Sequence, residues 1–122
     1  MIEQNLTALS QELTGELFFD NLHKSIYATD ASVYRKKPLA IAYPKNNDDL
    51  VILIEFAKNN YTTLIPRTAG TSLAGQCVGD GIVVDVSKYF TKIIAFDERN
   101  KTVTVQPGVI RDELNLFLKP YG

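Results

Sequence analysis

A glycine-rich segment, residues 66–76, has the composition of an anion-binding loop. It follows a predicted strand and reads Pro-Arg-Thr-Ala-Gly-Thr-Ser-Leu-Ala-Gly-Gln. Small residues let a ligand approach the backbone closely, and consecutive N–H groups can form a nest for an anion. Thr71 and Ser72 add hydroxyl groups, and Arg67 adds a positive charge. These properties suit a pyrophosphate, although a surface loop whose glycines only satisfy backbone geometry has the same composition.

Other familiar binding motifs are absent from the chain. There is no Gly-x-x-x-x-Gly-Lys-Ser/Thr segment, so a P-loop NTPase is not supported. There is no Gly-x-Gly-x-x-Gly segment after the first predicted strand, so the ordinary dinucleotide-binding fold is not supported. The single cysteine excludes an intrachain disulfide and a multi-cysteine metal site. We therefore predict no metal ligand, and we assign no catalytic residue within the chain.

Length and composition indicate one folded domain or one piece of a larger one. The chain has 122 residues, of which 45% are hydrophobic and 22% are charged. The formal net charge is −1, which argues against a nucleic-acid partner. The longest apolar run, residues 50–54, is too short for a transmembrane segment, and the N-terminus does not resemble a signal peptide. We expect a cytoplasmic protein, with peripheral contact at the inner membrane left open.

The hydrophobic pattern predicts an α+β fold. Helices are expected over residues 1–14, with Ile2, Leu6, Leu9 and Leu13 in one stripe, and over 17–26, with Leu17, Phe18, Leu22 and Ile26 toward one side. Strands are expected at 40–43, 63–66 and 82–86, and a hairpin at 93–96 and 102–105. Two further helices are expected, one capped by Asn47 with Asp48 and Asp49 in its first turn, and one over 110–118. The buried face of the helix after residue 47 is predicted to comprise Leu50, Leu53, Ile54 and Ala57.

Four segments of the chain carry a resemblance to a known family. They are residues 27–34 (Tyr-Ala-Thr-Asp-Ala-Ser-Val-Tyr), 66–72 (Pro-Arg-Thr-Ala-Gly-Thr-Ser), 81–87 (Gly-Ile-Val-Val-Asp-Val-Ser) and 103–109 (Val-Thr-Val-Gln-Pro-Gly-Val). In order and spacing they resemble the PCMH-type FAD-binding domain of the vanillyl-alcohol oxidase superfamily. The similarity is closest to D-lactate dehydrogenase and the glycolate oxidase D-subunit.

The resemblance implies a fold, a cofactor and a set of binding residues. It implies an N-terminal helical arm (1–36) followed by the first FAD-binding subdomain (37–122), with a small mixed sheet and flanking helices. Gly70, Thr71 and Ser72 would offer amides and hydroxyls to the FAD pyrophosphate. Arg67 would offer charge, or fix the loop through a carbonyl contact. The full set of predicted cofactor-binding residues is Pro66, Arg67, Thr68, Ala69, Gly70, Thr71, Ser72, Gly75, Gln76 and, for close backbone approach to the cofactor, Gly108.

Two features depart from the family pattern. Thr68 and Ala69 stand where the family most often has glycine, and each is tolerated if its φ is negative; a left-handed conformation would cost roughly 1–2 kcal/mol. Covalent members attach the flavin through a histidine in this region, whereas the only histidine here is His23, in the second predicted helix. The resemblance therefore implies non-covalent FAD, and we interpret His23 as an ordinary helix residue.

By the same resemblance, the parent protein is a flavin-dependent dehydrogenase that oxidises a D-2-hydroxy acid such as D-lactate or glycolate. The second FAD subdomain and the substrate domain would lie in the remainder of the parent chain, so residues 1–122 alone are expected to be inactive. The electron acceptor is not identified. Two alternatives stay open: a flavoenzyme of this superfamily with another substrate, and a non-catalytic module that has lost its flavin.

Three further features receive structural interpretations. Cys77 follows the loop with no neighbouring His or Lys to lower its pKa, which favours a space-filling role over a reactive thiol. The basic run at residues 35–37 is interpreted as a solvated turn. Asp85, in a strand of buried character, is expected to accept local hydrogen bonds. We also expect the strands at 82–86 and 102–105 to need cover from the rest of the parent.

Overall fold

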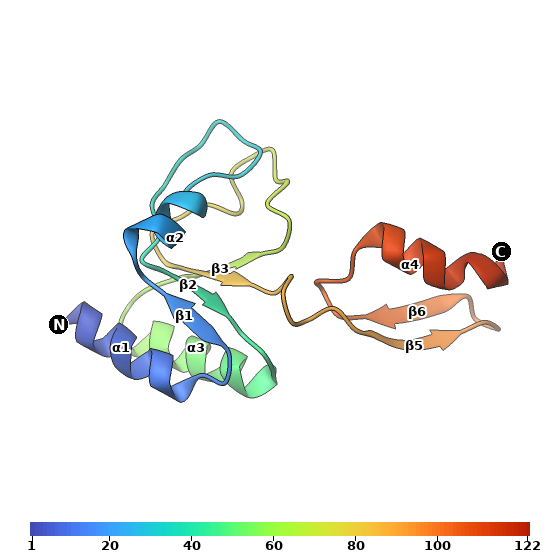
Figure 1. Cartoon of the computed structure of the whole chain (residues 1–122), viewed down its shortest axis with the longest axis horizontal. Coiled ribbons are helices and arrows are strands. Elements are labelled where there is room, and N and C mark those ends of the chain that lie inside the picture. The colour runs from blue at the N-terminus through green and yellow to red at the C-terminus, as the bar shows by residue number, and fades with distance from the viewer.

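The computed structural model describes all 122 residues as a main body and a smaller projecting unit (Figure 1). In chain order the elements are α1 (Ile2–Glu12), β1 (Glu16–Phe18), α2 (Asn21–Ile26), β2 (Ala40–Tyr43), α3 (Asn47–Asn59), β3 (Leu64–Arg67), β4 (Ile82–Asp85), β5 (Ile93–Asp97), β6 (Thr102–Val105), α4 (Arg111–Leu118) and a short 3₁₀ turn, Lys119–Tyr121. This mixture of helices and a small mixed sheet confirms the predicted α+β class.

A four-stranded sheet in the order β1-β2-β4-β3 forms the centre of the main body. β2, β4 and β3 are parallel, and β1 pairs with β2 in the antiparallel sense. α1 and α3 lie on one side of the sheet and α2 on the other (Figure 1). All four residues of the central strand β4 are buried, as expected for a parallel strand covered on both faces. The expectation that this strand needs cover from outside the chain is therefore wrong.

The main core lies between the sheet and the helices α1 and α3. Leu6, Leu9 and Leu13 of the first predicted stripe pack against Leu53 and Ile82. Ile2, at the start of that stripe, is exposed. A second, smaller cluster on the other face contains Ile41, Ile65 and Val83, with Tyr27 and Tyr43 packed against it. The body is thus held by apolar burial on both faces of one sheet.

The prediction of one helix over residues 17–26 is wrong at its beginning. Residues 16–18 form the edge strand β1, in which Leu17 is buried and its neighbours are half-buried. α2 begins only at Asn21, because the Asp20 carboxylate caps it by accepting the backbone N–H groups of Leu22 and His23. Leu22 and Ile26 are exposed, so they do not share a buried helix face with Leu17.

The helix α3 is capped by Asn46, whose side chain accepts the N–H of Asp49, so the prediction that Asn47 caps it is wrong by one residue. Its buried face differs from the prediction at one position. Leu53 and Ala57 are buried and Leu50 packs against the core, but Ile54 is exposed. Asp49 is fully buried instead; its carboxylate accepts the backbone N–H groups of Thr14, Gly15 and Lys45 at 2.7–2.9 Å. Burial alone would raise the pKa of Asp49, but these hydrogen bonds hold it below its ordinary value. The buried charge therefore ties the turn after α1 to the start of α3.

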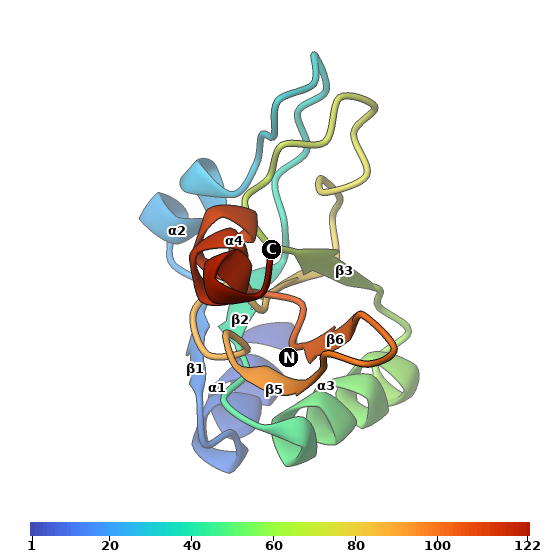
Figure 2. The same ribbon diagram turned by 90° about the vertical axis from the view of Figure 1, so that its right-hand side faces the viewer.

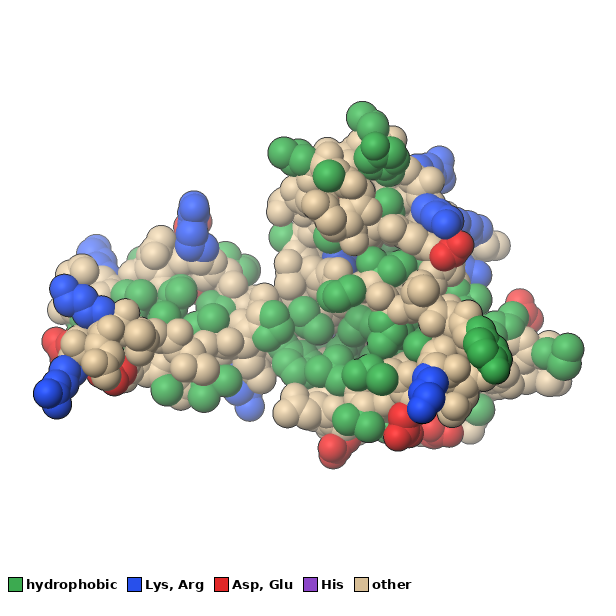
Figure 3. Space-filling model, turned by 180° about the vertical axis from the view of Figure 1, so that it is seen from behind, with side chains coloured by type: hydrophobic (Ala, Val, Ile, Leu, Met, Phe, Trp, Pro, Cys, Tyr) green, Lys and Arg blue, Asp and Glu red, His purple; other side chains and the backbone are tan.

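The C-terminal unit, residues 93–121, projects away from the body (Figure 1). β5 and β6 form the predicted hairpin, and α4 lies along it (Figure 2). Phe96, Phe117 and Tyr121 form a small aromatic cluster between them. Several apolar side chains of this unit stay at the surface, including Ile94 and Leu116, and Figure 3 shows hydrophobic atoms there from behind. No helix in the structure is long and apolar enough to span a bilayer.

Candidate functional site

A cleft of about 760 Å³ lies where the C-terminal unit leaves the body. One wall is the glycine loop (residues 66–76), which begins at the end of β3. The other wall combines the connection from β4 to β5 with the segment that leads into α4. β3 and β4 are parallel neighbours, so their carboxyl ends meet at this edge of the sheet. Open α/β sheets bind ligands at this kind of edge. The lining residues are Thr68, Ala69, Thr71, Ser87, Thr91, Pro107, Gly108, Val109, Ile110, Arg111 and Glu113.

The glycine loop offers a run of unused hydrogen-bond donors. No backbone N–H of residues 68–75 donates a hydrogen bond within the chain; the next donor, the N–H of Gln76, binds the Ser72 hydroxyl. Backbone N–H groups need partners when a ligand or another part of a protein covers them. An anion in the cleft would supply acceptors for the amides of Thr68, Ala69 and Thr71, which line it.

Two glycines shape the loop. Gly70 and Gly75 adopt left-handed conformations, with φ of +66° and +77°. Thr68 and Ala69 do not have positive φ, so the residues that replace family glycines carry no left-handed strain. The loop therefore keeps glycine where the backbone conformation requires it, and the condition for tolerating Thr68 and Ala69 is met.

The Arg67 side chain is engaged within the chain. Its Nη1 donates to the carbonyl oxygen of Thr29 at 2.8 Å, and its guanidinium carbon lies 5.0 Å from the centre of the Tyr27 ring. Arg67 does not line the cleft. Of the two roles considered from the sequence, charge toward the ligand or a carbonyl contact that fixes the loop, the observed geometry favours the second.

The remaining predicted residues of the loop lie beside the cleft. Pro66 occupies the exposed edge strand β3, where its lack of an N–H is tolerated. The Ser72 hydroxyl and the Gln76 side chain bind each other, and Gly75 packs against Tyr34. Of the ten predicted residues, the four that line the cleft are Thr68, Ala69, Thr71 and Gly108. Direct contact of any of the ten with a cofactor stays a prediction.

Gly108 permits a close approach between two backbone segments. Its N–H donates to the carbonyl oxygen of Phe90 at 2.7 Å. A Cβ at this position would lie 2.5 Å from the carbonyl oxygen of Val86 and 2.6 Å from that of Phe90. Because both oxygens belong to the backbone, only glycine fits here without moving the chain. Gly108 therefore fixes how the segment between β6 and α4 packs against the connection from β4 to β5.

Sequence reasoning did not identify the polar residues of the opposite wall. Ser87 follows the carboxyl end of β4, and Thr91 comes four residues later. Arg111, at the start of α4, is the only lysine or arginine of the lining, and its side chain is exposed. The position of Ser87 was recoverable from the rule on carboxyl ends of parallel strands. Arg111 enters the cleft only because the chain returns at Gly108, and no local pattern signals that return.

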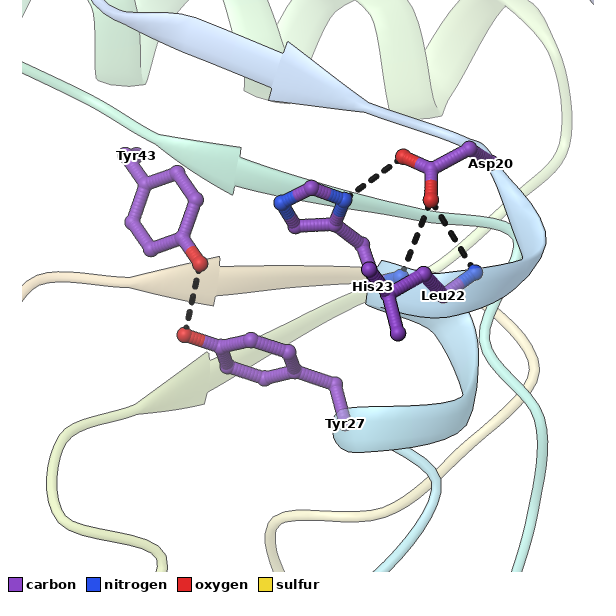
Figure 4. Close-up of polar contacts among 5 residues, drawn as sticks. All are labelled: Asp20, Leu22, His23, Tyr27 and Tyr43. Atoms are coloured by element: carbon purple, nitrogen blue, oxygen red, sulfur yellow. Dashed lines mark hydrogen bonds and ion pairs between the residues drawn. The ribbon is translucent and has the colours of Figure 1, made fainter.

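A network of hydrogen bonds among Tyr27, Tyr43, Asp85 and Ser87 fixes the cleft wall at Ser87. Asp85 Oδ1 accepts the N–H and the hydroxyl of Ser87, and Oδ2 accepts the Tyr27 hydroxyl at 2.5 Å. Tyr43 joins through a 2.8 Å contact between the two tyrosine oxygens (Figure 4). Burial, followed by the hydrogen bond to Asp85, raises the pKa of Tyr27 far above its ordinary value, so its hydroxyl stays protonated. The expectation that Asp85 accepts local hydrogen bonds is confirmed.

His23 has local partners that account for its position. Its Nδ1 lies 2.6 Å from Oδ2 of Asp20, and its ring stacks on Phe18 at a centroid distance of 4.0 Å (Figure 4). The hydrogen bond from the His23 backbone N–H is the main reason why the pKa of Asp20 lies below its ordinary value. His23 is absent from the cleft lining. The structure thus places it at the N-terminal cap of α2, as an ordinary helix residue.

The cleft has the chemistry of an anion site and lacks that of a metal or acid–base centre. Free amides, the hydroxyls of Thr68, Thr71 and Thr91, and the Arg111 guanidinium are all donors. Glu113 is the only carboxylate of the lining, and no cluster of His, Cys, Asp and Glu in the chain can hold a metal ion. This donor set suits the diphosphate of a dinucleotide.

Comparisons with known proteins agree with that chemistry. The chain is 36% identical over 115 residues to D-2-hydroxyglutarate dehydrogenase of Haemophilus influenzae, which covers 92% of this chain and 11% of that protein. It is 32% identical over 114 residues to glycolate oxidase subunit GlcD of Bacillus subtilis, which covers 90% of this chain and 24% of that protein. It is 35% identical over 125 residues to the mitochondrial D-lactate dehydrogenase (cytochrome) of Kluyveromyces lactis. This match covers 98% of this chain and 20% of that protein. The chain thus spans a small part of the length of these relatives.

Solved structures share the fold at low sequence identity. An alkyldihydroxyacetonephosphate synthase superimposes with a TM-score of 0.82 at 18% identity, over 98% of this chain and 25% of that one. p-Cresol methylhydroxylase gives a TM-score of 0.82 at 12% identity, over 98% of this chain and 24% of that one. Residues 38–122 match the family model described as an FAD binding domain. The chain therefore has the fold of these PCMH-type domains and belongs to the FAD binding domain family, and its cofactor is FAD.

Proposed function

We propose that the cleft holds the pyrophosphate of FAD, and that the complete polypeptide carrying these residues is a dehydrogenase of a D-2-hydroxy acid. The observation that carries the first part is the run of free backbone amides at residues 68–75, beside the carboxyl ends of β3 and β4. The second part is supported by relatives named for D-2-hydroxyglutarate, glycolate and D-lactate.

The residues present fit the proposed group. The amides of Thr68, Ala69 and Thr71, with the Thr71 hydroxyl, would bind the phosphate oxygens from one wall. Arg111 and Thr91 would approach from the other wall. Charge-assisted hydrogen bonds of this kind contribute roughly 1.5–3 kcal/mol each before the costs of association. When bound, FAD would supply the two-electron oxidation of a 2-hydroxy acid to a 2-oxo acid, in which the substrate loses its Cα–H as hydride and its hydroxyl proton. The role of residues 1–122 is then to bind and orient the cofactor.

The substrate-handling groups are proposed to lie outside this chain. The cleft lining contains no histidine, and its one carboxylate, Glu113, is exposed on α4. We propose that the projecting unit packs against the remainder of the polypeptide, since Ile94, Leu116 and Phe117 are exposed on it. The FAD is proposed to be non-covalent, because no histidine lies in the glycine loop. A cytoplasmic location and an electron carrier other than NAD complete the proposal.

The main reason for considering a non-catalytic module without flavin does not apply. That idea rested on Thr68 and Ala69 at positions where the family favours glycine. Neither residue has positive φ, and both line the cleft with their amides free. The replacement of glycine at these two positions therefore does not close the site.

The proposed activity predicts a stereospecific reduction of the flavin. The complete polypeptide should be yellow when purified, and acid precipitation should release its FAD, as expected for a non-covalent cofactor. Under anaerobic conditions, D-2-hydroxyglutarate, D-lactate or glycolate should bleach the flavin absorbance, whereas L-2-hydroxyglutarate and L-lactate should not. A yellow protein that none of these acids reduces would indicate another substrate within the superfamily. A colourless protein that does not take up added FAD would contradict the cofactor assignment.

A further inference from the structure

We propose that Arg67 is a positioning residue that braces the glycine loop against the turn at residues 27–31 and does not contact the pyrophosphate. The inference rests on the proposed function of the cleft and assigns this side chain a role in shaping it. Three sets of contacts carry the proposal: those of the guanidinium itself, those of Gly70, and those of the cleft lining.

The guanidinium binds residues on both sides of the loop. Nη1 donates to the Thr29 carbonyl oxygen at 2.8 Å and makes a longer contact, 3.5 Å, to the carbonyl oxygen of Cys77. The guanidinium carbon lies over the Tyr27 ring, within cation–π range of its centre. Tyr27 is in turn fixed by its hydrogen bond to Asp85. The side chain therefore links the start and the end of the glycine loop to the N-terminal turn.

Gly70 is held between that turn and the guanidinium. Its carbonyl oxygen accepts the N–H of Ala31 at 3.0 Å. A Cβ on Gly70 would lie 2.4 Å from Nη2 and 2.8 Å from Cζ of Arg67, so the guanidinium rests against the Gly70 backbone. The left-handed φ of Gly70 places the loop's direction change at this point. Arg67 thus supports the turn between Ala69 and Thr71, two cleft-lining residues whose amides are free.

Positive charge in the cleft comes from another residue. Arg111 lines the cleft and Arg67 does not. Lysine cannot replace arginine in a role of this kind, because an ammonium group lacks the planar surface that stacks on Tyr27 and the several donors that reach separate carbonyls. Lysine would, however, preserve much of a simple charge contact. Arg67→Lys keeps the positive charge and Arg67→Gln removes it. Comparing the two variants therefore distinguishes a positioning role of Arg67 from a charge contact with the cofactor.

The experiment uses apoprotein prepared from the complete polypeptide by removing its flavin. Two quantities are measured for the wild type, Arg67→Lys, Arg67→Gln and Arg111→Gln: deuterium uptake without flavin at the amide of Ala31, which donates to the Gly70 carbonyl oxygen, and the Kd for FAD at several salt concentrations. Circular dichroism confirms folding. The uptake measurement needs no cofactor, so it tests the brace even if the proposed function is wrong.

We expect both Arg67 variants to take up deuterium faster at Ala31 and to bind FAD more weakly to a similar extent, on the order of 100-fold, since small misplacements of binding groups have effects of this size. Their salt dependence of binding should equal that of the wild type. Arg111→Gln should leave exchange at Ala31 unchanged and reduce the salt dependence. Near-normal binding by Arg67→Lys with weak, less salt-dependent binding by Arg67→Gln would overturn the proposal, as would unchanged exchange at Ala31 in both Arg67 variants.

Discussion

Replacing Gly108 with alanine is expected to weaken FAD binding by the complete polypeptide by one to two orders of magnitude while the main body stays folded. The added Cβ would lie within 2.6 Å of two backbone carbonyl oxygens, those of Val86 and Phe90. Neither oxygen can move without shifting the segment that leads from β4 to β5. Overpacking of this kind costs typically 1–3 kcal/mol, and about 1.4 kcal/mol corresponds to a tenfold change in affinity. The strain falls at the contact between the β4–β5 connection and the segment that leads into α4, both of which line the cleft.

The matched control for this variant is Gly79→Ala. A Cβ on Gly79 would also meet a close neighbour, at 2.6 Å, but that neighbour is the terminal methyl of Ile65, which can rotate away. Gly79 does not line the cleft. Flavin absorbance per protein, with circular dichroism as the folding check, should fall for Gly108→Ala and stay near the wild-type value for Gly79→Ala. Full flavin content in Gly108→Ala would show that the close backbone contact at Gly108 is not needed for FAD binding.

Replacing Gly70 with valine is expected to abolish flavin retention through a change in loop shape. A residue other than glycine at φ of +66° costs roughly 1–2 kcal/mol, and a β-branched side chain is especially disfavoured there. The new Cβ would also collide with the Arg67 guanidinium, which Thr29 and Tyr27 hold in place. The side chain would point at Arg67, so the expected loss comes from a displaced loop and not from direct blocking of the pyrophosphate.

Ala74→Val provides the matched comparison for Gly70→Val. Ala74 is exposed in the same loop, lacks positive φ and does not line the cleft, so it tests whether valine in this loop is harmful in itself. Flavin content after purification should be lost in Gly70→Val and kept in Ala74→Val. If Gly70→Val keeps a full flavin complement, the assignment of the glycine loop as the pyrophosphate site must be withdrawn.

The parts of the fold that the sequence predicted are those with strong local patterns. β2 and β4 are runs of apolar residues, as parallel strands buried on both faces are, and the polar turn between β5 and β6 indicated the hairpin. β1 was missed because three residues, Glu16 to Phe18, are too few to display a period, and their antiparallel pairing with β2 depends on residues about 25 positions away. Ile54 was misplaced because one position along a helix turns a side chain by about 100°.

The candidate site was predictable on one wall only. The composition of the glycine loop and the resemblance of residues 66–72 located that wall. The opposite wall depends on the return of the chain at Gly108, which brings Arg111 next to a loop about 40 residues earlier in the sequence. The orientation of Arg67 away from the cleft was equally inaccessible, because it follows from contacts with Tyr27 and Thr29 in three dimensions.

Hydrogen exchange at the backbone amides of residues 68–75, measured with and without FAD in the complete polypeptide, tests the central claim most directly. These amides donate no hydrogen bond within the chain, so they should exchange rapidly in the apoprotein. If the glycine loop holds the pyrophosphate, FAD should slow exchange at residues 68–71 while peptides from α1 and α3 stay unchanged. A separate cavity in the C-terminal unit is lined by Phe96 and Tyr121, among other residues. Unaltered exchange in the loop, with protection by FAD at that cavity instead, would contradict the account.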